Sequence, residues 1–225
     1  MAGTAAVANR IEDAMLASFA AAERRETPYR NWRVAELFPD RVAEALAELP
    51  FHAVDVHGVS GRRELHNDQR SYFAGDVLAR NAVAREVVEA FQSPRIVRAI
   101  MDHTGARLAG TYLRIEYAID ISGFWLEPHT DLGVKTYTML YQLGRDGQED
   151  LGTDVYADRE TWVERVPFGW NTAFVFVPSD NTWHGFEARK IARPRRSVII
   201  NYVTDEWRAR EQLAYPTEPV RGLEG

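Results

Sequence analysis

The chain has 225 residues, 45% of them hydrophobic, which is enough for one folded domain. Its formal net charge is −6 and no basic stripe runs along it, so we do not expect nucleic acid as a partner. It has no cysteine, which excludes disulfides and thiolate ligands and leaves histidine and carboxylate side chains to hold any metal ion.

No apolar run approaches the roughly 18 residues that a membrane-spanning helix needs. The alanine-rich start is interrupted by Arg10, Glu12 and Asp13, so it lacks the apolar centre of a signal peptide. We therefore expect a soluble, cytoplasmic protein with no membrane partner. The sequence leaves the oligomeric state open.

Helical periodicity dominates the first part of the chain. Apolar residues recur at helical spacing and predict helices over 5–24, 40–49 and 79–104. The stretch FHAVDVHGV (51–59) alternates and predicts a strand, and the polar run over 61–73 predicts a solvated loop. We expect these elements to pack on the rest of the chain as a helical region with one or two strands.

From Ala106 onward the apolar period changes from 3.6 to 2. The alternation predicts eight short strands, over 110–118, 124–131, 135–143, 153–157, 161–166, 171–178, 183–188 and 195–203. Short strands at this spacing are typical of a jelly-roll. We expect a mainly β fold in one structural domain, with a helical N-terminal region (1–105), a jelly-roll, cupin-like core (106–215) supported by α-helices, and a loose C-terminal tail (216–225).

Two His-x-Asp pairs occur, and their surroundings distinguish them. His129 and Asp131 are two residues apart, so in a strand both side chains leave one face while Thr130 points away. They lie in FWLEPHTDLGVK, between the strand-like stretches TYLRIEY and KTYTMLYQL. The second pair, in residues 66–68, lies in a polar run without alternation, which we interpret as a loop. We therefore expect the functional pair at His129 and Asp131.

A third candidate ligand, His184, comes from a separate segment. It follows the strand NTAFVFVP and turn residues at 179–181, so we expect it to open the return strand of a hairpin. Two imidazoles and one carboxylate make a three-point metal site with open coordination positions. This ligand set suits Fe(II) better than a closed structural zinc site.

Arg195, Arg196 and Ser197 open the apolar strand SVIINYV. Alternation puts Arg195 and Ser197 on one face and Arg196 on the other. An arginine and a serine on one face can hold a carboxylate, because the guanidinium forks onto both oxygens and the hydroxyl adds a donor.

This combination of His-x-Asp, a distal His and Arg-x-Ser resembles the Fe(II)/2-oxoglutarate-dependent dioxygenases, most closely the prolyl-hydroxylase-like branch, over about half of the chain. The resemblance implies a double-stranded β-helix in which His129, Asp131 and His184 bind Fe(II). It implies that Arg195, helped by Ser197, binds the far carboxylate of 2-oxoglutarate. It also implies O2 as the oxidant, with ascorbate as a supporting reductant.

The resemblance suggests further roles. Because Asp131 supplies a carboxylate where halogenating members have a small residue, it implies hydroxylation or a related C–H oxidation such as desaturation or ring closure. Tyr117 stands where the family often has a tyrosine bonded to 2-oxoglutarate. Thr138 and Gln142 share one face of their strand, from which we expect polar contacts to the co-substrate.

The substrate is the open question. Mild acidity, compact size and the lack of a second domain favour a small molecule, with Arg114, Phe124 and Trp125 as candidates for the substrate side. The alternative to a fully solvated loop over 61–73 is that Arg70 and Tyr72 turn toward the substrate entrance. A protein or peptide side-chain hydroxylase of the same fold is the alternative within the family. Two alternatives come from other classes: a non-redox cupin-like enzyme holding Zn2+ or Mn2+, and a binding or structural jelly-roll module in which the three ligands satisfy one another.

Overall fold

The computed structural model describes residues 2–55, 60–62, 69–131 and 133–220. Its helices are α1 (Ala2–Ala20), α2 (Asp40–Ala47), α3 (Gly75–Arg80), α4 (Ala82–Gln92) and α5 (Pro94–Thr104). Its strands are β1 (Glu23–Arg25), β2 (Asn31–Ala35), β3 (Ser71–Tyr72), β4 (Tyr112–Asp120), β5 (Leu126–His129), β6 (Lys135–Leu143), β7 (Thr153–Tyr156), β8 (Trp162–Val166), β9 (Trp170–Phe176), β10 (His184–Phe186) and β11 (Arg195–Val203).

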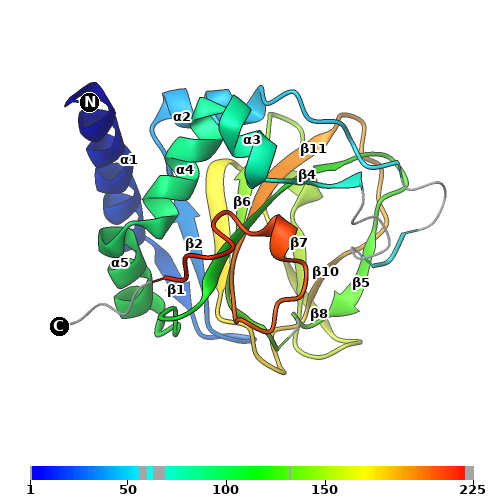
Figure 1. Cartoon of the computed structure of the whole chain (residues 1–225). Coiled ribbons are helices and arrows are strands. Elements are labelled where there is room, and N and C mark those ends of the chain that lie inside the picture. The colour runs from blue at the N-terminus through cyan, green and yellow to red at the C-terminus, as the bar shows by residue number, and fades with distance from the viewer. Residues whose placement is uncertain (1, 56–59, 63–68, 132, 221–225) are drawn as a thin grey trace.

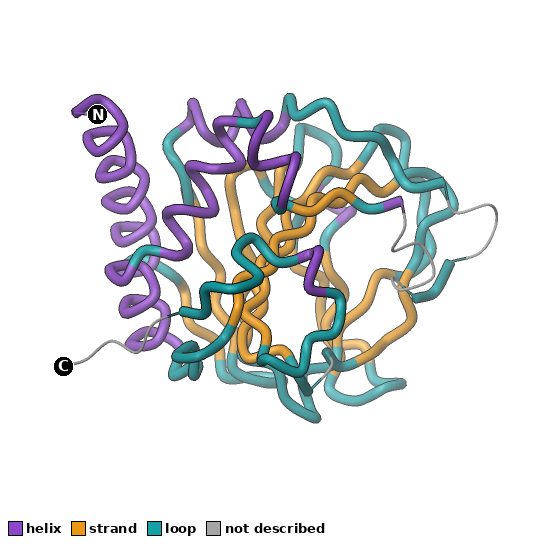
Figure 2. Tube along the Cα trace, viewed as in Figure 1, coloured by secondary structure: helices purple, strands orange, loops and turns teal. Residues whose placement is uncertain are grey.

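The strands form two antiparallel sheets. The larger sheet has the order β1-β2-β9-β6-β11-β4-β3, and the smaller sheet has the order β5-β10-β7-β8. The helices gather on one side of the molecule, against the larger sheet, while the smaller sheet lies on the other side (Figure 1, Figure 2). The predicted fold class is confirmed: a mainly β jelly-roll supported by α-helices.

Alternation along the strands divides the larger sheet into two faces. On β4 and β11 the residues that pack into the helix-side core are apolar, and they are Leu113, Ile115, Tyr117, Ile119, Val198, Ile200 and Tyr202. Helices α4 and α5 cover this face with apolar residues at helical spacing, namely Val87, Val88, Phe91, Ile96, Val97 and Ile100. Each of these large side chains contributes roughly 1.5–3 kcal/mol when fully buried. The opposite face of the same strands is left for the site.

Local signals fix the ends of α5. The Ser93 hydroxyl accepts a hydrogen bond from the Arg95 N–H at 3.3 Å, and Pro94 occupies the first turn, where its missing N–H costs nothing. Gly105 ends the helix at φ 76°, a conformation that glycine adopts without strain. The helical stretch predicted over 79–104 is therefore divided at Ser93, immediately before α5 begins.

Three predictions about the periphery differ from the structure. Residues 51–55 form no strand, and the rest of that predicted strand lies outside the described residues. Strands β1 and β2 were not predicted, because they are too short for their sequences to show a clear alternation of apolar and polar residues. The tail is not loose over 216–220, because the Val220 N–H donates to the Thr111 carbonyl at 2.7 Å and the Val220 side chain is buried.

The predicted hairpin before His184 is also wrong. Strand β9 belongs to the larger sheet, whereas β10 pairs with β5 and β7 in the smaller one. The turn at 179–181 therefore carries the chain from one sheet to the other. A turn signal shows that the chain reverses, but it does not specify which sheet the next strand joins. Among the described residues, no helix has the length and apolar character needed to cross a bilayer.

Candidate metal centre and its cavity

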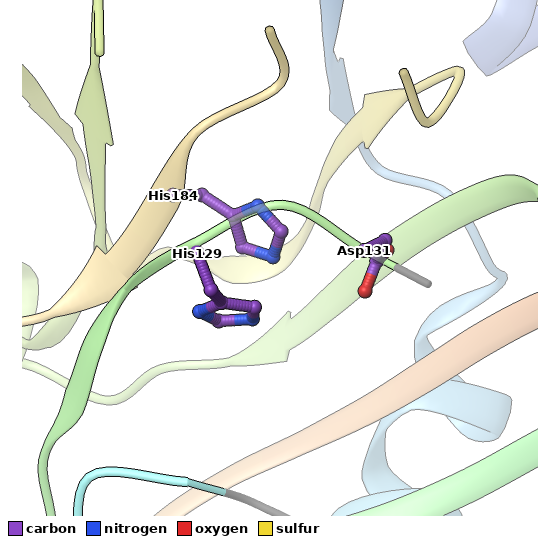
Figure 3. A group of neighbouring side chains, drawn as sticks. All are labelled: His129, Asp131 and His184. Carbon is purple, nitrogen blue, oxygen red and sulfur yellow. The ribbon is translucent and has the colours of Figure 1, made fainter. Parts of the chain in front are cut away.

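The smaller sheet brings the two histidines together. His129 ends β5 and His184 begins β10, and the two residues lie opposite each other in the antiparallel register. Their ring centroids are 4.4 Å apart. Asp131 follows two residues after β5, and the ligand atoms of all three residues lie within 4.8 Å of one another (Figure 3). Because β5 stops at His129, strict alternation does not extend to Asp131, and Thr130 also lines the cavity rather than pointing away from it.

Backbone carbonyls fix the tautomer of both imidazoles. His129 Nδ1 lies 2.8 Å from the Glu127 carbonyl oxygen, and His184 Nδ1 lies 2.9 Å from the Thr182 carbonyl oxygen. A carbonyl only accepts, so each Nδ1 carries a proton, and in the neutral imidazole it is Nε2 that keeps the lone pair. Burial, with a further effect of neighbouring His129, lowers the pKa of His184 to about 3. That imidazole is therefore neutral at pH 7, the form that binds a metal ion.

Asp131 is held by two donors. Its Oδ2 accepts from the Thr138 hydroxyl at 2.6 Å, and its Oδ1 pairs with Lys135 Nζ at 2.6 Å. Burial alone would raise the pKa of Asp131, but the charges of Lys135 and His184 and the two hydrogen bonds hold that pKa below its ordinary value. The carboxylate is therefore ionised. Two imidazole nitrogens and one carboxylate oxygen fit a non-haem Fe(II) site with open positions.

A cavity of about 360 Å³ adjoins the three residues and is lined by both sheets. Its wall also includes the predicted anion-binding pair, Arg195 and Ser197. The predicted alternation on β11 is confirmed, since Arg196 faces the other way, with a guanidinium nitrogen 3.5 Å from the Tyr117 hydroxyl.

Arg195 is buried and firmly held. Its Nη1 donates to Asp120 Oδ2 and its Nε donates to the Leu151 carbonyl, both at 2.6 Å. The guanidinium lies 4.7 Å from the ring centroid of Phe168 and 5.0 Å from that of Phe186. These contacts fix the position of the guanidinium beside the cavity. Its binding of 2-oxoglutarate stays a prediction.

The structure does not bring Tyr117 to the site. Its ring packs in the helix-side core against Phe51, at 5.0 Å between centroids, and its hydroxyl donates to the Leu46 carbonyl at 2.8 Å. The expectation that Tyr117 contacts the co-substrate is wrong, because the odd-numbered residues of β4 face the helices. In TYLRIEY the charged residues Arg114 and Glu116 alternate with apolar neighbours, and this alternation indicates that Tyr117 lies on the apolar face of the strand.

Thr138 lines the cavity, but its hydroxyl holds Asp131. Gln142 shares its face and is engaged elsewhere, since its Oε1 accepts from the Gly169 N–H and the Thr172 hydroxyl. Among the three substrate-side candidates, Arg114 and Phe124 line the cavity. Trp125 does not line it and is 39% exposed, with its ring against Gly61.

Several cavity residues were missed by sequence reasoning. Lys135, Glu116 and Trp207 all line the wall. Glu116 was detectable, because a charged residue in an apolar alternating strand points away from the core. The predicted solvated loop is wrong at Arg70, whose side chain is 2% exposed and pairs with Glu116 Oε1 at 2.6 Å. The second His-x-Asp pair, in residues 66–68, lies outside the described residues.

The fold is similar to that of solved prolyl hydroxylases and of a 2OG-Fe(II) oxygenase family protein. A prolyl-4-hydroxylase from Pseudomonas putida aligns with TM-score 0.50 and 16% identity, over 86% of this chain and 94% of that one. A Trichoplax adhaerens prolyl hydroxylase, solved with a peptide fragment of hypoxia inducible factor, aligns with TM-score 0.56 and 10% identity, over 88% and 91%.

An oxidoreductase of the 2OG-Fe(II) oxygenase family from Burkholderia pseudomallei aligns with TM-score 0.50 and 17% identity, over 89% of this chain and 90% of that one. No family model matches the sequence, and no curated protein matches it. At these identities the similarity establishes the fold, and the chemistry has to be argued from the residues of this chain.

Proposed function

We propose that the protein is an Fe(II)/2-oxoglutarate-dependent dioxygenase that hydroxylates a small-molecule substrate or carries out a related C–H oxidation on it. The observation that carries this proposal is the convergence of His129, Asp131 and His184, with both Nε2 lone pairs available, beside a cavity walled by Arg195 and Ser197. The first three residues would hold Fe(II), and the last two would hold the far carboxylate of 2-oxoglutarate.

Bound Fe(II), 2-oxoglutarate and O2 together supply the oxidising chemistry, with succinate and CO2 as co-products. The chain orients the metal ligands and keeps water away from the reacting atoms. The carbonyls of Glu127 and Thr182 keep both imidazoles in the ligating tautomer, and Thr138 orients the carboxylate of Asp131. Apolar wall residues such as Phe186 exclude water from the reacting atoms.

The size of the cavity supports a small-molecule substrate. Its volume of about 360 Å³ is within the range of small-ligand sites. Two of the similar structures are prolyl hydroxylases, and one was solved with a peptide fragment, so a peptide is the competing substrate class. A peptide library and a metabolite library, each scored by substrate-dependent succinate release, would distinguish the two.

The reaction class is tested by adding Fe(II), 2-oxoglutarate and ascorbate to the protein in air and measuring succinate. We expect succinate from the unaltered chain and none from His184→Ala. A non-redox metal enzyme or a binding module would release none in either case, and that result would refute the proposal.

The role of Arg195 is tested separately. We expect Arg195→Ala to raise the concentration of 2-oxoglutarate needed for half-maximal turnover by tenfold or more, because charge-assisted hydrogen bonds are each worth about 1.5–3 kcal/mol. Iron binding should stay nearly unchanged. Arg196→Ala is the matched control, since that side chain faces away from the cavity. Loss of iron from the Arg195 variant would refute the assigned role.

A further inference from the structure

We propose that the primary substrate carries a carboxylate and that Arg114 binds it, at the opposite end of the cavity from Arg195. This inference rests on the proposed function, because it names the substrate class of the same site. The observations behind it are the fixed position of the Arg114 guanidinium, its unused donors, the charge around it and its short connection to Asp131.

Arg114 is a buried arginine held in one orientation. It is 5% exposed and lines the cavity from near the start of β4. Its guanidinium packs against two aromatic rings, 4.8 Å from the centroid of Tyr72 and 4.9 Å from that of Trp207. Because these contacts already hold the guanidinium in place, binding a ligand there costs little further side-chain entropy.

Donors remain at this position. An arginine has five N–H groups, and three in Arg114 donate, to Gln212 Oε1 at 2.9 Å, Asn201 Oδ1 at 3.3 Å and Glu116 Oε2 at 3.0 Å. The other two make no hydrogen bond to the described residues apart from the interaction of the guanidinium with the Tyr72 hydroxyl. The indole Nε1 of Trp207 is also buried without a partner among them. A carboxylate only accepts hydrogen bonds, so it suits a place with unused donors.

The charge around Arg114 favours an anion. Glu116 pairs with Arg114 at 3.0 Å and with Arg70 at 2.6 Å, so each of its oxygens already contacts a guanidinium. Because both oxygens of Glu116 are engaged, a cationic substrate group would meet the two guanidiniums, whereas an anionic group could pair with the guanidinium of Arg114.

Hydrogen bonds connect this end of the cavity to the metal centre. Asn201 lies between Arg114 and Thr138 in the sheet register. Its amide accepts from Arg114 at 3.3 Å and donates to the Thr138 hydroxyl at 2.9 Å, and that hydroxyl donates to Asp131 at 2.6 Å. Adjacent strands are about 4.8 Å apart, so roughly 10 Å separates the Cα atoms of Arg114 and Thr138.

The two arginines therefore serve different ligands. Asn201 and Arg195 are six residues apart on β11, roughly 20 Å at the rise of a strand. An acid anchored at Arg114 need not displace 2-oxoglutarate from Arg195. Because Arg114 is close to the ligand-orienting Thr138, the acid must be compact for its C–H bonds to lie beside the three metal ligands.

The test measures binding, not turnover. Calorimetric titrations of the full chain, with Mn(II) and 2-oxoglutarate and again without them, would use acetate, hexanoate and phenylacetate, each beside its uncharged amide. We expect at least one acid to bind tenfold or more tightly than its amide. If no acid binds more tightly than its amide, the proposal is wrong, whatever any variant does.

Variants locate the site. We expect Arg114→Gln to abolish the preference for the acid and Arg114→Lys to keep part of it, while Arg196→Gln, on the face of β11 turned away from the cavity, leaves it unchanged. The affinity for 2-oxoglutarate should be unchanged in Arg114→Gln and reduced in Arg195→Gln. An acid preference that survives in folded Arg114→Gln would overturn the assignment. A preference that depends on Arg114 in a protein making no succinate would refute only the proposed reaction, and succinate without any acid preference would refute only the Arg114 site.

Discussion

Replacing Thr138 by valine tests whether the surroundings of Asp131 are built to orient a metal ligand. Valine has nearly the shape of threonine without the hydroxyl, so the substitution removes two hydrogen bonds and little else. One is the bond to Asp131 Oδ2 at 2.6 Å, and the other is accepted from Asn201 Nδ2 at 2.9 Å. Afterwards Asp131 keeps its ion pair with Lys135, at 2.6 Å.

Two effects should follow, of different size. The loss of an orienting hydrogen bond on a metal ligand typically weakens metal binding 10–100-fold, so we expect a loss of that order for Thr138→Val. Stability should also fall. Asn201 is fully buried and would keep only the Tyr137 carbonyl, at 3.4 Å, as acceptor for its amide. Removing a partner from buried polar groups costs about 1–3 kcal/mol, which is the expected drop in the free energy of unfolding.

Mn(II) titration followed by electron paramagnetic resonance would give the metal affinity, and urea denaturation would give the stability. Thr136→Val is the matched control, because its hydroxyl donates to the Tyr202 carbonyl at 3.2 Å and makes no contact with Asp131. It should bind Mn(II) like the unaltered chain. If folded Thr138→Val also binds Mn(II) within twofold of the unaltered chain, the reasoning about this hydroxyl is wrong.

Two further predictions concern stability. In the metal-free protein, the pKa of His184 is lowered to about 3, whereas an unfolded imidazole has a pKa near 6.5, so between these values the unfolded chain takes up a proton that the folded chain does not. The free energy of unfolding should therefore fall with falling pH through this window, by up to about 1.4 kcal/mol per pH unit from this residue. Urea denaturation measured at several pH values should show a weaker dependence of the unfolding free energy on pH in His184→Asn than in the unaltered chain. An equal slope in both proteins would contradict the prediction. Tyr117→Phe should lose about 1 kcal/mol of stability, since the hydrogen bond to the Leu46 carbonyl goes, and should keep its 2-oxoglutarate requirement. A raised 2-oxoglutarate requirement in Tyr117→Phe would indicate that Tyr117 does contact the co-substrate.

The parts of the site that sequence predicted correctly depend on local geometry. Alternation along SVIINYV placed Arg195 and Ser197 on the cavity side and Arg196 on the other, because strand parity needs no knowledge of the partner strand. The same rule, applied to TYLRIEY, would have placed Tyr117 in the helix-side core. Its assignment to the co-substrate came from family spacing, and parity overruled it.

The parts that sequence did not predict depend on long-range pairing. Nothing near His184 specifies that β10 joins β5 rather than β9, because that choice is made by packing between the two sheets. In the same way, the polar run around Arg70 looks solvated until Glu116, 46 residues away, is placed beside it. Buried polar residues whose partners are distant in sequence are the ones that local patterns miss.

These buried charges also bear on both proposals. The cavity face of β4 carries Arg114, Glu116 and Asp120, all at most 5% exposed. Burying an ion pair costs desolvation energy that its attraction only partly returns, and an apolar pair of similar volume is often as stable or more so. Stability therefore gives little reason to place Arg114 with Glu116 and Arg195 with Asp120 inside the domain. Each pairing does hold a guanidinium in a fixed position beside the same cavity. Two such guanidiniums, at opposite ends of β4 and β11, match a reaction in which a dicarboxylate co-substrate and an acidic substrate bind at the same time.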